Sequence, residues 1–520
     1  MKVVLIASPY PLEEAPSPPL GLCYAAAAFE AAGAKVRILD YMVRYYSPEK
    51  MAAELADFDP DVIGAGSVTL NFFAAADILK TAKRLFPRAV TVMGGPHVSF
   101  DYENTLRQFP EIDLIVVGEG EATIQELVPV IGDRKAWAEV RGIAFADGDR
   151  IRFTGLRDLI DDLDRLPLPA RHLLPMSRYK ALGFPISIIT SRGCPGRCIF
   201  CQGRRMVGSR IRNRDPRLVV DEIETLLGYG FERVNFADDF FTSNPRRVRE
   251  ICAEIERRGL SFSWAGFARA DSVTPEMLAM MRQAGCDSIF FGFESGNQAV
   301  LDRIKKGIKL DRVRKAVADA KAAGMRVFGS FIVGLPGETP ENLMESHRFA
   351  RELDVEYGYH FLAPFPGTEV KEEMDRYDLE LLTDNWNDFD ANSAIVRTSA
   401  LSPEDIERFV KTYYSDEIEK EEARMEKEFG EGTLSVEEQL RYMGKQKLEI
   451  VFQLLSEDLL ENAPPFSMAN GLSPVKALAR YLADVTGKPM DFVNLSVQQF
   501  SDLGYIGYRE QDRQAVWHWC

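Results

Sequence analysis

The sequence predicts an α/β protein in three parts: a doubly wound parallel sheet, a partial barrel of six βα units, and a helical C-terminal region. Three observations support this. Nearly continuous apolar segments alternate with helical segments up to about residue 395, which is typical of parallel sheets covered on both faces. Prolines interrupt this alternation between residues 166 and 185. Beyond residue 396 only helical periodicity remains.

The first unit, residues 1–140, is predicted to be a Rossmann-like domain. Its strands are the apolar runs at 3–8, 36–40, 61–67, 89–94 and 113–118. Its helices are expected at 20–32, 48–58, 72–86 and 122–131. Ligands of such sheets bind at the carboxyl ends of the strands, where glycine permits close approach of the backbone. The candidate binding residues at these ends are Ser67, Thr69, Gly94, Gly95, His97, Gly118 and Glu119.

A connecting segment, residues 141–185, and a second α/β unit, residues 186–395, follow. The connection begins with a hairpin at 143–153 around Asp147-Gly-Asp149 and continues into the proline-rich stretch. Strands of the second unit are expected at 186–190, 233–237, 263–267, 287–293, 327–334 and 359–364. Helices are expected at 217–227, 246–258, 275–283, 311–323 and 341–353. Six βα units are two fewer than a complete TIM barrel contains, so the neighbouring domain must close the open side.

The last unit, residues 396–520, shows helical patterns at 402–414, 417–429, 440–459 and 475–485. The whole chain is 46% hydrophobic and 27% charged, which is ordinary for a soluble globular protein. Its net charge of −16 argues against nucleic acid as a partner, because phosphate contacts require clustered Lys and Arg. No apolar segment is long enough to predict a membrane span. We expect a cytoplasmic protein with reduced thiols.

Three of the seven cysteines, Cys194, Cys198 and Cys201, lie in one loop directly after the first strand of the second unit. Their C-x3-C-x2-C spacing can hold three irons of a [4Fe–4S] cluster, whose complete protein ligation would take four cysteines. A structural zinc site would require a fourth Cys or His nearby, and the nearest candidate is the distant His172. A disulfide framework is implausible in a chain of this length without a signal peptide.

This loop resembles the cluster loop of the radical S-adenosylmethionine (SAM) enzymes. The resemblance implies a (β/α)6 partial barrel in which SAM binds the fourth iron through its amino and carboxylate groups. An electron from the cluster then cleaves SAM to methionine and a 5′-deoxyadenosyl radical. The resemblance also implies an enzyme that functions under anaerobic conditions.

The resemblance extends to residues at the ends of successive barrel strands. It implies that Asp238 or Asp239 accepts hydrogen bonds from the SAM amino group, since a carboxylate suits a cationic donor. It also implies that Arg269 and Asp271 contact the ribose and carboxylate, although they could instead form a surface pair. The remaining implied SAM-binding positions are Glu294 and Ser295 near the ribose, Gly334 near the adenine, and Phe200, which could instead seal the core.

An α/β domain ahead of such a barrel is similar to the cobalamin-binding members of the family. Pro18-Pro-Leu-Gly-Leu22 and the glycine-rich strand ends carry this similarity, which implies bound cobalamin. The Asp-x-His-x-x-Gly motif that places a histidine on cobalt is absent, so the cobalt has no histidine beneath it. His97 either contacts the cobalamin tail or caps the following helix, and the capping role is favoured. The alternative is a domain that has lost cobalamin and only covers the barrel.

We therefore expect a cobalamin-dependent radical SAM methyltransferase that acts on an unactivated carbon of a small molecule. An external electron donor of the flavodoxin or ferredoxin type would reduce the cluster. No residue is assigned a catalytic role beyond binding the cofactors. Two alternatives remain: a ring-forming or rearranging enzyme with the same cofactors, and a non-catalytic iron–sulfur protein that carries or senses electrons.

Overall fold

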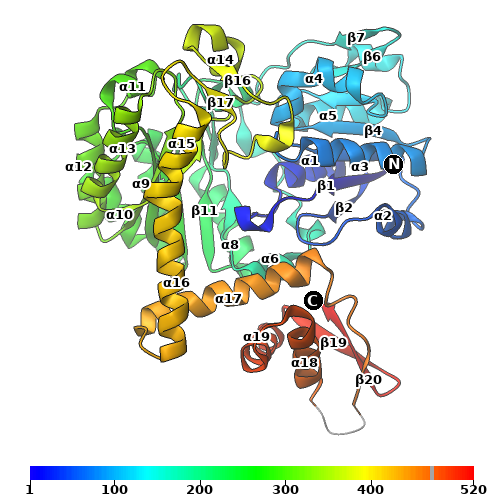
Figure 1. Ribbon diagram of the computed structural model, residues 1–520. Helices are drawn as coiled ribbons and strands as arrows, with labels where there is room; N and C mark the ends of the chain where they lie inside the picture. The colour runs from blue at the N-terminus through cyan, green and yellow to red at the C-terminus, as the bar shows by residue number, and fades with distance from the viewer. Residues whose placement is uncertain (469–472) are drawn as a thin grey trace.

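A computed structural model describes residues 1–468 and 473–520. The first domain has a seven-stranded sheet in the order β2-β1-β3-β4-β5-β6-β7 (Figure 1). Its first five strands are parallel: β1 (Lys2–Ala7), β2 (Lys35–Asp40), β3 (Val62–Gly66), β4 (Val90–Gly94) and β5 (Leu114–Val116). The predicted hairpin is present as β6 (Ile143–Asp147) and β7 (Arg150–Phe153), and it extends this sheet by two antiparallel strands.

Helices cover both faces of this sheet, as a doubly wound fold requires. They are α1 (Leu20–Ala31), α2 (Pro48–Leu55), α3 (Phe72–Leu85), α4 (Pro96–Gln108) and α5 (Glu121–Leu127). Buried residues of α1 and α5 form one apolar core with the sheet, and those of α2, α3 and α4 form another on the opposite face. The continuous apolar strands are therefore explained by burial on both sides. Helix α4 begins in the glycine-rich loop after β4, where no helix was predicted.

The second domain is the predicted partial barrel. Six parallel strands lie in the order β15-β14-β13-β12-β11-β8. Their bounds are β8 (Ile186–Ile188), β11 (Arg233–Phe236), β12 (Ser263–Ala268), β13 (Cys286–Glu294), β14 (Arg326–Val333) and β15 (Glu356–Phe361). The outer helices are α8 (Pro216–Gly228), α9 (Pro245–Arg257), α10 (Pro275–Gln283), α11 (Gln298–Arg303), α12 (Leu310–Ala322) and α13 (Pro340–Leu353).

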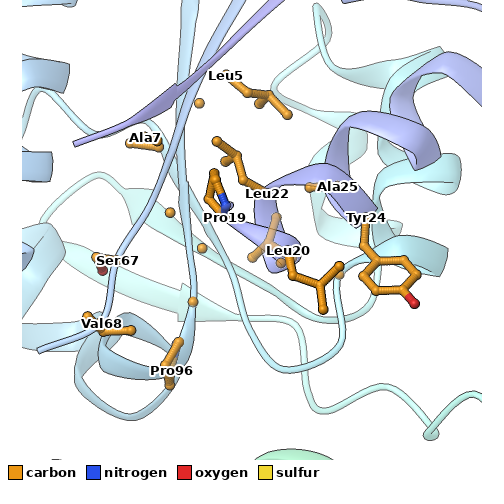
Figure 2. A pocket seen from close by; sticks show the side chains of 18 of the residues that line it. Leu5, Ala7, Pro19, Leu20, Leu22, Tyr24, Ala25, Ser67, Val68 and Pro96 are labelled. Atoms are coloured by element: carbon orange, nitrogen blue, oxygen red, sulfur yellow. The ribbon is translucent and has the colours of Figure 1, made fainter. Parts of the chain in front are cut away.

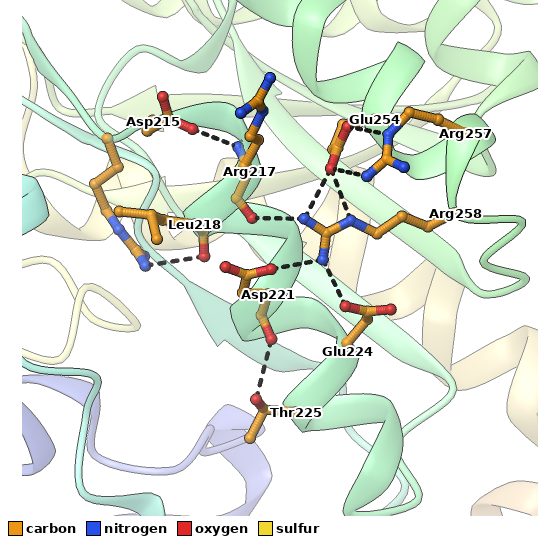
Figure 3. Close-up of polar contacts among 10 residues, drawn as sticks. Asp215, Arg217, Leu218, Asp221, Glu224, Thr225, Glu254, Arg257 and Arg258 are labelled. Carbon is orange, nitrogen blue, oxygen red and sulfur yellow. Dashed lines mark hydrogen bonds and ion pairs between the residues drawn. The ribbon is translucent and has the colours of Figure 1, made fainter.

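Four of these helices begin in the same way. Asp215, Asn244, Thr274 and Thr339 each accept a hydrogen bond from a backbone N–H of the first turn, and each is followed by proline. Such caps satisfy donors that would otherwise lack partners, and proline suits the first helical position. On the outer surface, Arg258 joins α8 to α9 through Asp221, Glu224 and Glu254 (Figure 3).

Short elements connect the domains and surround the cysteine loop. They are α6 (Met176–Leu182), β9 (Ser191–Arg192), α7 (Gly203–Val207), β10 (Arg212–Asn213), α14 (Glu369–Glu372), β16 (Glu380–Leu381) and β17 (Val396–Arg397). Single 3-10 turns lie at Leu12–Glu14, Val128–Val130, Ala136–Glu139, Leu163–Arg165, Arg171–Leu173, Phe241–Ser243, Met374–Tyr377 and Trp386–Asp388.

The C-terminal region is largely helical, as predicted, but it also contains a small antiparallel sheet. The helices are α15 (Pro403–Val410), which continues as a π-helical turn (Lys411–Ser415), α16 (Asp416–Glu431), α17 (Val436–Ser456), α18 (Pro474–Thr486) and α19 (Met490–Asp502). The sheet has the order β18-β20-β19, with β18 (Phe466–Ser467), β19 (Ile506–Gln511) and β20 (Gln514–Trp519). Ion pairs from Asp458 to Lys50 and from Glu461 to Arg178 hold this region against the first domain and α6. Among the described residues, no helix is long and apolar enough to cross a membrane.

Candidate functional site

A cavity of about 550 Å³ lies where the first domain meets the barrel. Its walls come from the carboxyl ends of β1, β3, β4 and β5, from the start of α1, and from the barrel segment after β8. Figure 2 shows the part of the wall formed by β1, the start of α1 and the loops after β3 and β4. Predicted binding residues that line it are Ser67, Gly94, Gly95, Gly118 and Glu119, with Asp239 on the barrel side. Apolar residues of the Pro-Pro-Leu-Gly-Leu segment, including Pro19, Leu20 and Leu22, complete the wall.

Glycine is required where the loop after β4 enters the cavity. Gly95 has φ +112°, and a Cβ atom there would lie 2.3 Å from the carbonyl oxygen of Ser67. Gly118 also has a positive φ, of +77°, and open space on the side where a Cβ would stand. These glycines leave the peptide backbone within reach of a ligand, as a large, flat cofactor such as cobalamin requires. No histidine is among the described residues that line the cavity.

His97 and Thr69 lie beside the cavity and do not line it. The ring of His97 is fully buried, stacks on Phe72 with ring centres 4.1 Å apart, and packs edge-on against Trp386. Its Nδ1 lies 3.2 Å from the hydroxyl of Thr69. Burial lowers the pKa of His97 to about 4, so the ring is neutral at pH 7. The favoured capping role was wrong, because Gly95 is the N-cap of α4 and His97 lies within the first turn.

The cysteine loop is closed at its base by the pairing of β9 with β10. Gly193, with φ +107°, permits this closure, since a Cβ atom would lie 2.3 Å from the carbonyl oxygen of Arg210. A Cβ on Gly196 would lie 3.2 Å from the sulfur of Cys194 and 3.9 Å from that of Cys198. The backbone N–H of Gly203 lies 3.4 Å from the sulfur of Cys201. The loop therefore gathers its thiols around small residues, leaving room that larger side chains would fill.

This arrangement fits a [4Fe–4S] cluster better than a single metal ion. Among the described residues, no three His, Cys, Asp or Glu side chains converge closely enough for one ion. A cubane does not require such convergence, because each thiolate binds a different iron. Burial raises the pKa of the Cys198 and Cys201 thiols, and the charges of the other cysteines contribute in the same direction. Iron binding would hold these groups as thiolates.

Two cationic side chains stand beside the cysteines. Lys306 pairs with Glu294 at 2.5 Å, and the pair is almost completely buried. Arg269 donates two hydrogen bonds to Asp271, each of 3.0 Å, and a third to the carbonyl oxygen of Lys306. Both the Lys306 and the Arg269 cation interact with the charge of Cys198. The positive charges suit a cluster with anionic ligands. Lys306 was not predicted, because it lies in a loop before α12 that contains no recognisable motif.

The two neighbouring aspartates after β11 have different environments. Asp238 is buried and accepts hydrogen bonds from the backbone N–H and hydroxyl of Thr190 and from the hydroxyl of Ser191. It therefore fastens β11 to β8. Asp239 faces the cavity, and its carboxylate oxygen lies 2.9 Å from where a Cβ of Gly203 would stand. Burial, followed by the charge of Asp238, raises the pKa of Asp239, against the hydrogen bond from Gly193.

Of the remaining residues that were predicted to bind SAM, some lie at the mouth of the barrel and others are packed in its core. Gly334, with φ +82°, donates its N–H to the buried carboxylate of Glu338. Ser295 is fully buried, where its hydroxyl receives the N–H of Asn297 at the start of α11 and contacts Ser346. Phe200 is half-buried against the main core. The three cysteines, Asp239, Arg269, Asp271 and Glu294 are therefore brought to one end of the barrel, whereas Ser295 is part of the packing beneath it.

Comparisons with known proteins agree with this geometry. Residues 188–350 match the Radical SAM superfamily model, and residues 14–128 match the B12 binding domain model. An uncharacterized methyltransferase of Pyrococcus horikoshii is 34% identical over 400 residues, which cover 76% of this chain and 87% of that protein. The anaerobic magnesium-protoporphyrin IX monomethyl ester cyclase of Cereibacter sphaeroides is 33% identical over 69% of this chain and 60% of its own length.

Solved structures share the fold at low sequence identity. The radical SAM methyltransferase TsrM of Kitasatospora setae superposes with a TM-score of 0.66 and 19% identity, covering 80% of this chain and 89% of that one. The cobalamin-dependent radical SAM enzyme OxsB superposes with a TM-score of 0.67 and 18% identity, covering 96% and 83%. The protein therefore belongs to the cobalamin-binding radical SAM enzymes, which use a [4Fe–4S] cluster, SAM and cobalamin.

Proposed function

We propose that this enzyme transfers a methyl group from methylcobalamin to an unactivated carbon of a small molecule. One observation carries the proposal: the cavity of the first domain and the cysteine loop share a wall. Asp239 lines the cavity and also approaches Gly203, whose N–H contacts the sulfur of Cys201. A cofactor in the cavity and SAM on the cluster would then both face the same substrate.

The roles of the residues follow from their positions. Cys194, Cys198 and Cys201 would each hold one iron, which leaves the fourth iron for SAM. The Asp239 carboxylate lines the cavity beside Gly203 of the cysteine loop and would suit the SAM amino group, whereas the oxygens of Asp238 are already engaged. When bound, the cluster and cobalamin supply the radical and the methyl group, and the protein positions them and excludes solvent.

The cavity lining supports a cobalamin without a histidine ligand from the protein. Without a histidine among its described lining residues, the cobalt would lack a strong lower donor from the protein, and its methyl group would leave more readily to a carbon radical. The relative of Pyrococcus horikoshii, described as a methyltransferase and matched over 87% of its length, also favours methyl transfer. An external flavodoxin- or ferredoxin-type donor would supply the electrons.

A second candidate is ring formation without methyl transfer. The cyclase of Cereibacter sphaeroides is almost as similar to this chain, at 33% identity, although the match covers only 60% of that protein. Both candidates use the same residues to bind the cofactors. They differ in the use of SAM: methylation consumes one SAM to methylate cob(I)alamin and a second to form the radical, whereas ring formation needs only the second.

The test is to count the SAM products. Anaerobically reconstituted enzyme would be incubated with cobalamin, a reductant, SAM carrying a deuterated methyl group, and a small-molecule extract of the source organism. Methyl transfer predicts equal amounts of S-adenosylhomocysteine and 5′-deoxyadenosine, together with a product that carries the labelled methyl. Formation of 5′-deoxyadenosine with an unlabelled product and no S-adenosylhomocysteine would instead support ring formation. The Cys198→Ala variant, which should yield no 5′-deoxyadenosine, is the control.

A further inference from the structure

The base of the cysteine loop is fastened to the first domain by an unusual pair of arginines. Arg192 on β9 and Arg212 on β10 lie directly opposite each other in the antiparallel register. Like charges at such positions repel. Both guanidinium groups instead bind one carboxylate, that of Glu119, which follows β5 in the other domain. Glu119 therefore stabilises a pairing that would otherwise be unfavourable.

The bonds to Glu119 occupy its whole carboxylate. One oxygen accepts from Arg192 at 3.2 Å and from Arg212 at 2.8 Å. The other accepts from Arg212 at 2.9 Å and from the backbone N–H of Ile160 at 2.9 Å. Four donors are about the full capacity of an ionised carboxylate. Glu119 lines the cavity, but its carboxylate oxygens have no capacity left for hydrogen bonds from a ligand, so a contact between this residue and a cofactor would come from its backbone or methylene groups.

The cluster formed by Glu119, Glu121, Arg192 and Arg212 is buried, and its two negative charges balance its two positive charges. The side chains of Glu119, Arg192 and Arg212 are 5%, 10% and 1% exposed, and Glu121 pairs with Arg192 as a second carboxylate. Burial opposes ionisation of Glu119, but the hydrogen bonds and charges of the arginines outweigh it and lower its pKa. Removing one member would leave a buried charge without its partner, which is far more costly than losing a surface ion pair.

Glu119, Arg192 and Arg212 each lie next to a segment that forms one of the two cofactor sites. Arg192 precedes Gly193 and Cys194, so its position sets where the cluster loop begins. Arg212 also donates to the carbonyl oxygen of Val207, at the end of α7, which closes the loop on its other side. On the first domain, Glu119 follows Gly118, and both residues line the cavity. A displacement of Glu119 relative to the arginines would change the separation between the two sites.

We propose that Glu119 is a positioning residue that sets the distance between cobalamin and the iron–sulfur cluster through Arg192 and Arg212. This inference rests on the proposed function, because it requires cobalamin in the cavity. The reaction to which it applies is transfer of a methyl cation from SAM to cob(I)alamin, which yields methylcobalamin and S-adenosylhomocysteine. That transfer requires the methyl carbon to stand in line with cobalt, so small displacements matter.

The test compares Glu119→Gln with Glu126→Gln in the reconstituted holoenzyme. Glu126 lies on the same segment, at α5, and pairs with Arg157, but its side chain is 52% exposed. Iron, bound cobalamin and the thermal midpoint are measured first. The magnetic interaction between cob(II)alamin and the reduced cluster is then recorded by electron paramagnetic resonance, and methylcobalamin formation is followed by absorbance. If Glu119→Gln does not fold, Glu119→Asp, which keeps the charge but shortens the reach, takes its place.

Glu119→Gln should retain iron and cobalamin, but the magnetic interaction between cob(II)alamin and the reduced cluster should be weaker or more widely distributed in strength. Methylcobalamin should form roughly 10- to 100-fold more slowly, because a misplacement of about 1 Å can cost two orders of magnitude. Glu126→Gln should match the wild type. An unchanged magnetic interaction, with a methylation rate within about twofold of the wild type, would overturn the inference. Failure of the wild type itself to bind cobalamin would instead overturn the proposed function.

Discussion

The neighbouring aspartates after β11 allow stability and cofactor binding to be separated by two adjacent substitutions. Asp238→Ala removes a buried carboxylate that accepts three hydrogen bonds, at 2.6 Å from the N–H of Thr190 and at 2.5 and 2.6 Å from the hydroxyls of Thr190 and Ser191. Asp239→Ala removes a carboxylate that faces the cavity. We expect the first substitution to destabilise the barrel and the second to weaken SAM binding.

The size of each effect follows from the contacts. Hydrogen bonds to a charged group contribute about 1.5–3 kcal/mol each, but the two hydroxyls at Asp238 can rotate toward other partners. The N–H of Thr190 cannot, so we expect Asp238→Ala to cost about 3–5 kcal/mol. For a unit of this size, that loss lowers the thermal midpoint by roughly 10 °C. Asp239→Ala should cost about 1 kcal/mol or less, because removing the carboxylate also relieves its burial.

Two measurements on the anaerobic holoenzyme test this reasoning. Circular dichroism gives the thermal midpoint, and equilibrium dialysis gives the affinity for SAM. Because Asp239→Ala removes a charge-assisted hydrogen bond, this variant should bind SAM about 10- to 100-fold more weakly than the wild type. The reasoning is refuted if Asp239→Ala is as destabilising as Asp238→Ala and binds SAM normally, or if Asp238→Ala melts within about 2 °C of the wild type.

Three further predictions concern the cluster, the glycine-rich cavity lining and the buried histidine. Cys198→Ala should lose iron-dependent absorbance and SAM cleavage, whereas Cys252→Ala, at a buried core cysteine, should keep both. Gly95→Ala should weaken cobalamin binding at least tenfold because its Cβ would meet the backbone of the loop after β3. Gly132→Ala, at a glycine that does not line the cavity and has no atom within 4 Å of its Cβ position, should bind cobalamin normally in a titration followed by absorbance. Burial lowers the pKa of His97 to about 4, so the unfolded chain binds a proton between about pH 6.5 and 4 that the folded protein does not. The free energy of unfolding should therefore fall as the pH falls through this window, by about 1.4 kcal/mol at pH 5.5. Thermal midpoints of His97→Phe measured at a series of pH values should lack this contribution. A pH dependence as steep as that of the wild type would contradict the prediction.

Much of the fold could be predicted because its strands are buried on both faces. Apolar runs of this kind have few alternative interpretations, and the observed strands begin and end within a few residues of the predicted bounds. The elements that were missed lack such signals. Helix α4 is rich in polar residues and departs from helical geometry at Asp101. The β19–β20 hairpin turns at Asp512 and Arg513, which both have positive φ without the glycine that usually marks such a turn.

The candidate site was predicted where its residues are close in sequence. The cysteine spacing and the glycine-rich strand ends are local patterns, and both lie at the expected ends of their strands. Partnerships between distant residues could not be predicted. Glu119 is 73 residues from Arg192 and 93 from Arg212, and nothing in either segment identifies the other. Similarly, only packing decides that Asp238 turns into the protein and Asp239 toward the cavity.

The walls of the cavity come from two lobes, and this has a consequence for the protein inside a cell. A molecule that binds between the lobes contacts both, so its binding free energy adds to the energy that holds them together. Vitamin supply should therefore govern how much intact enzyme accumulates. Cells grown without cobalamin should contain protein that opens more often at the junction and is cleaved there by proteases, within the connecting segment at 141–185.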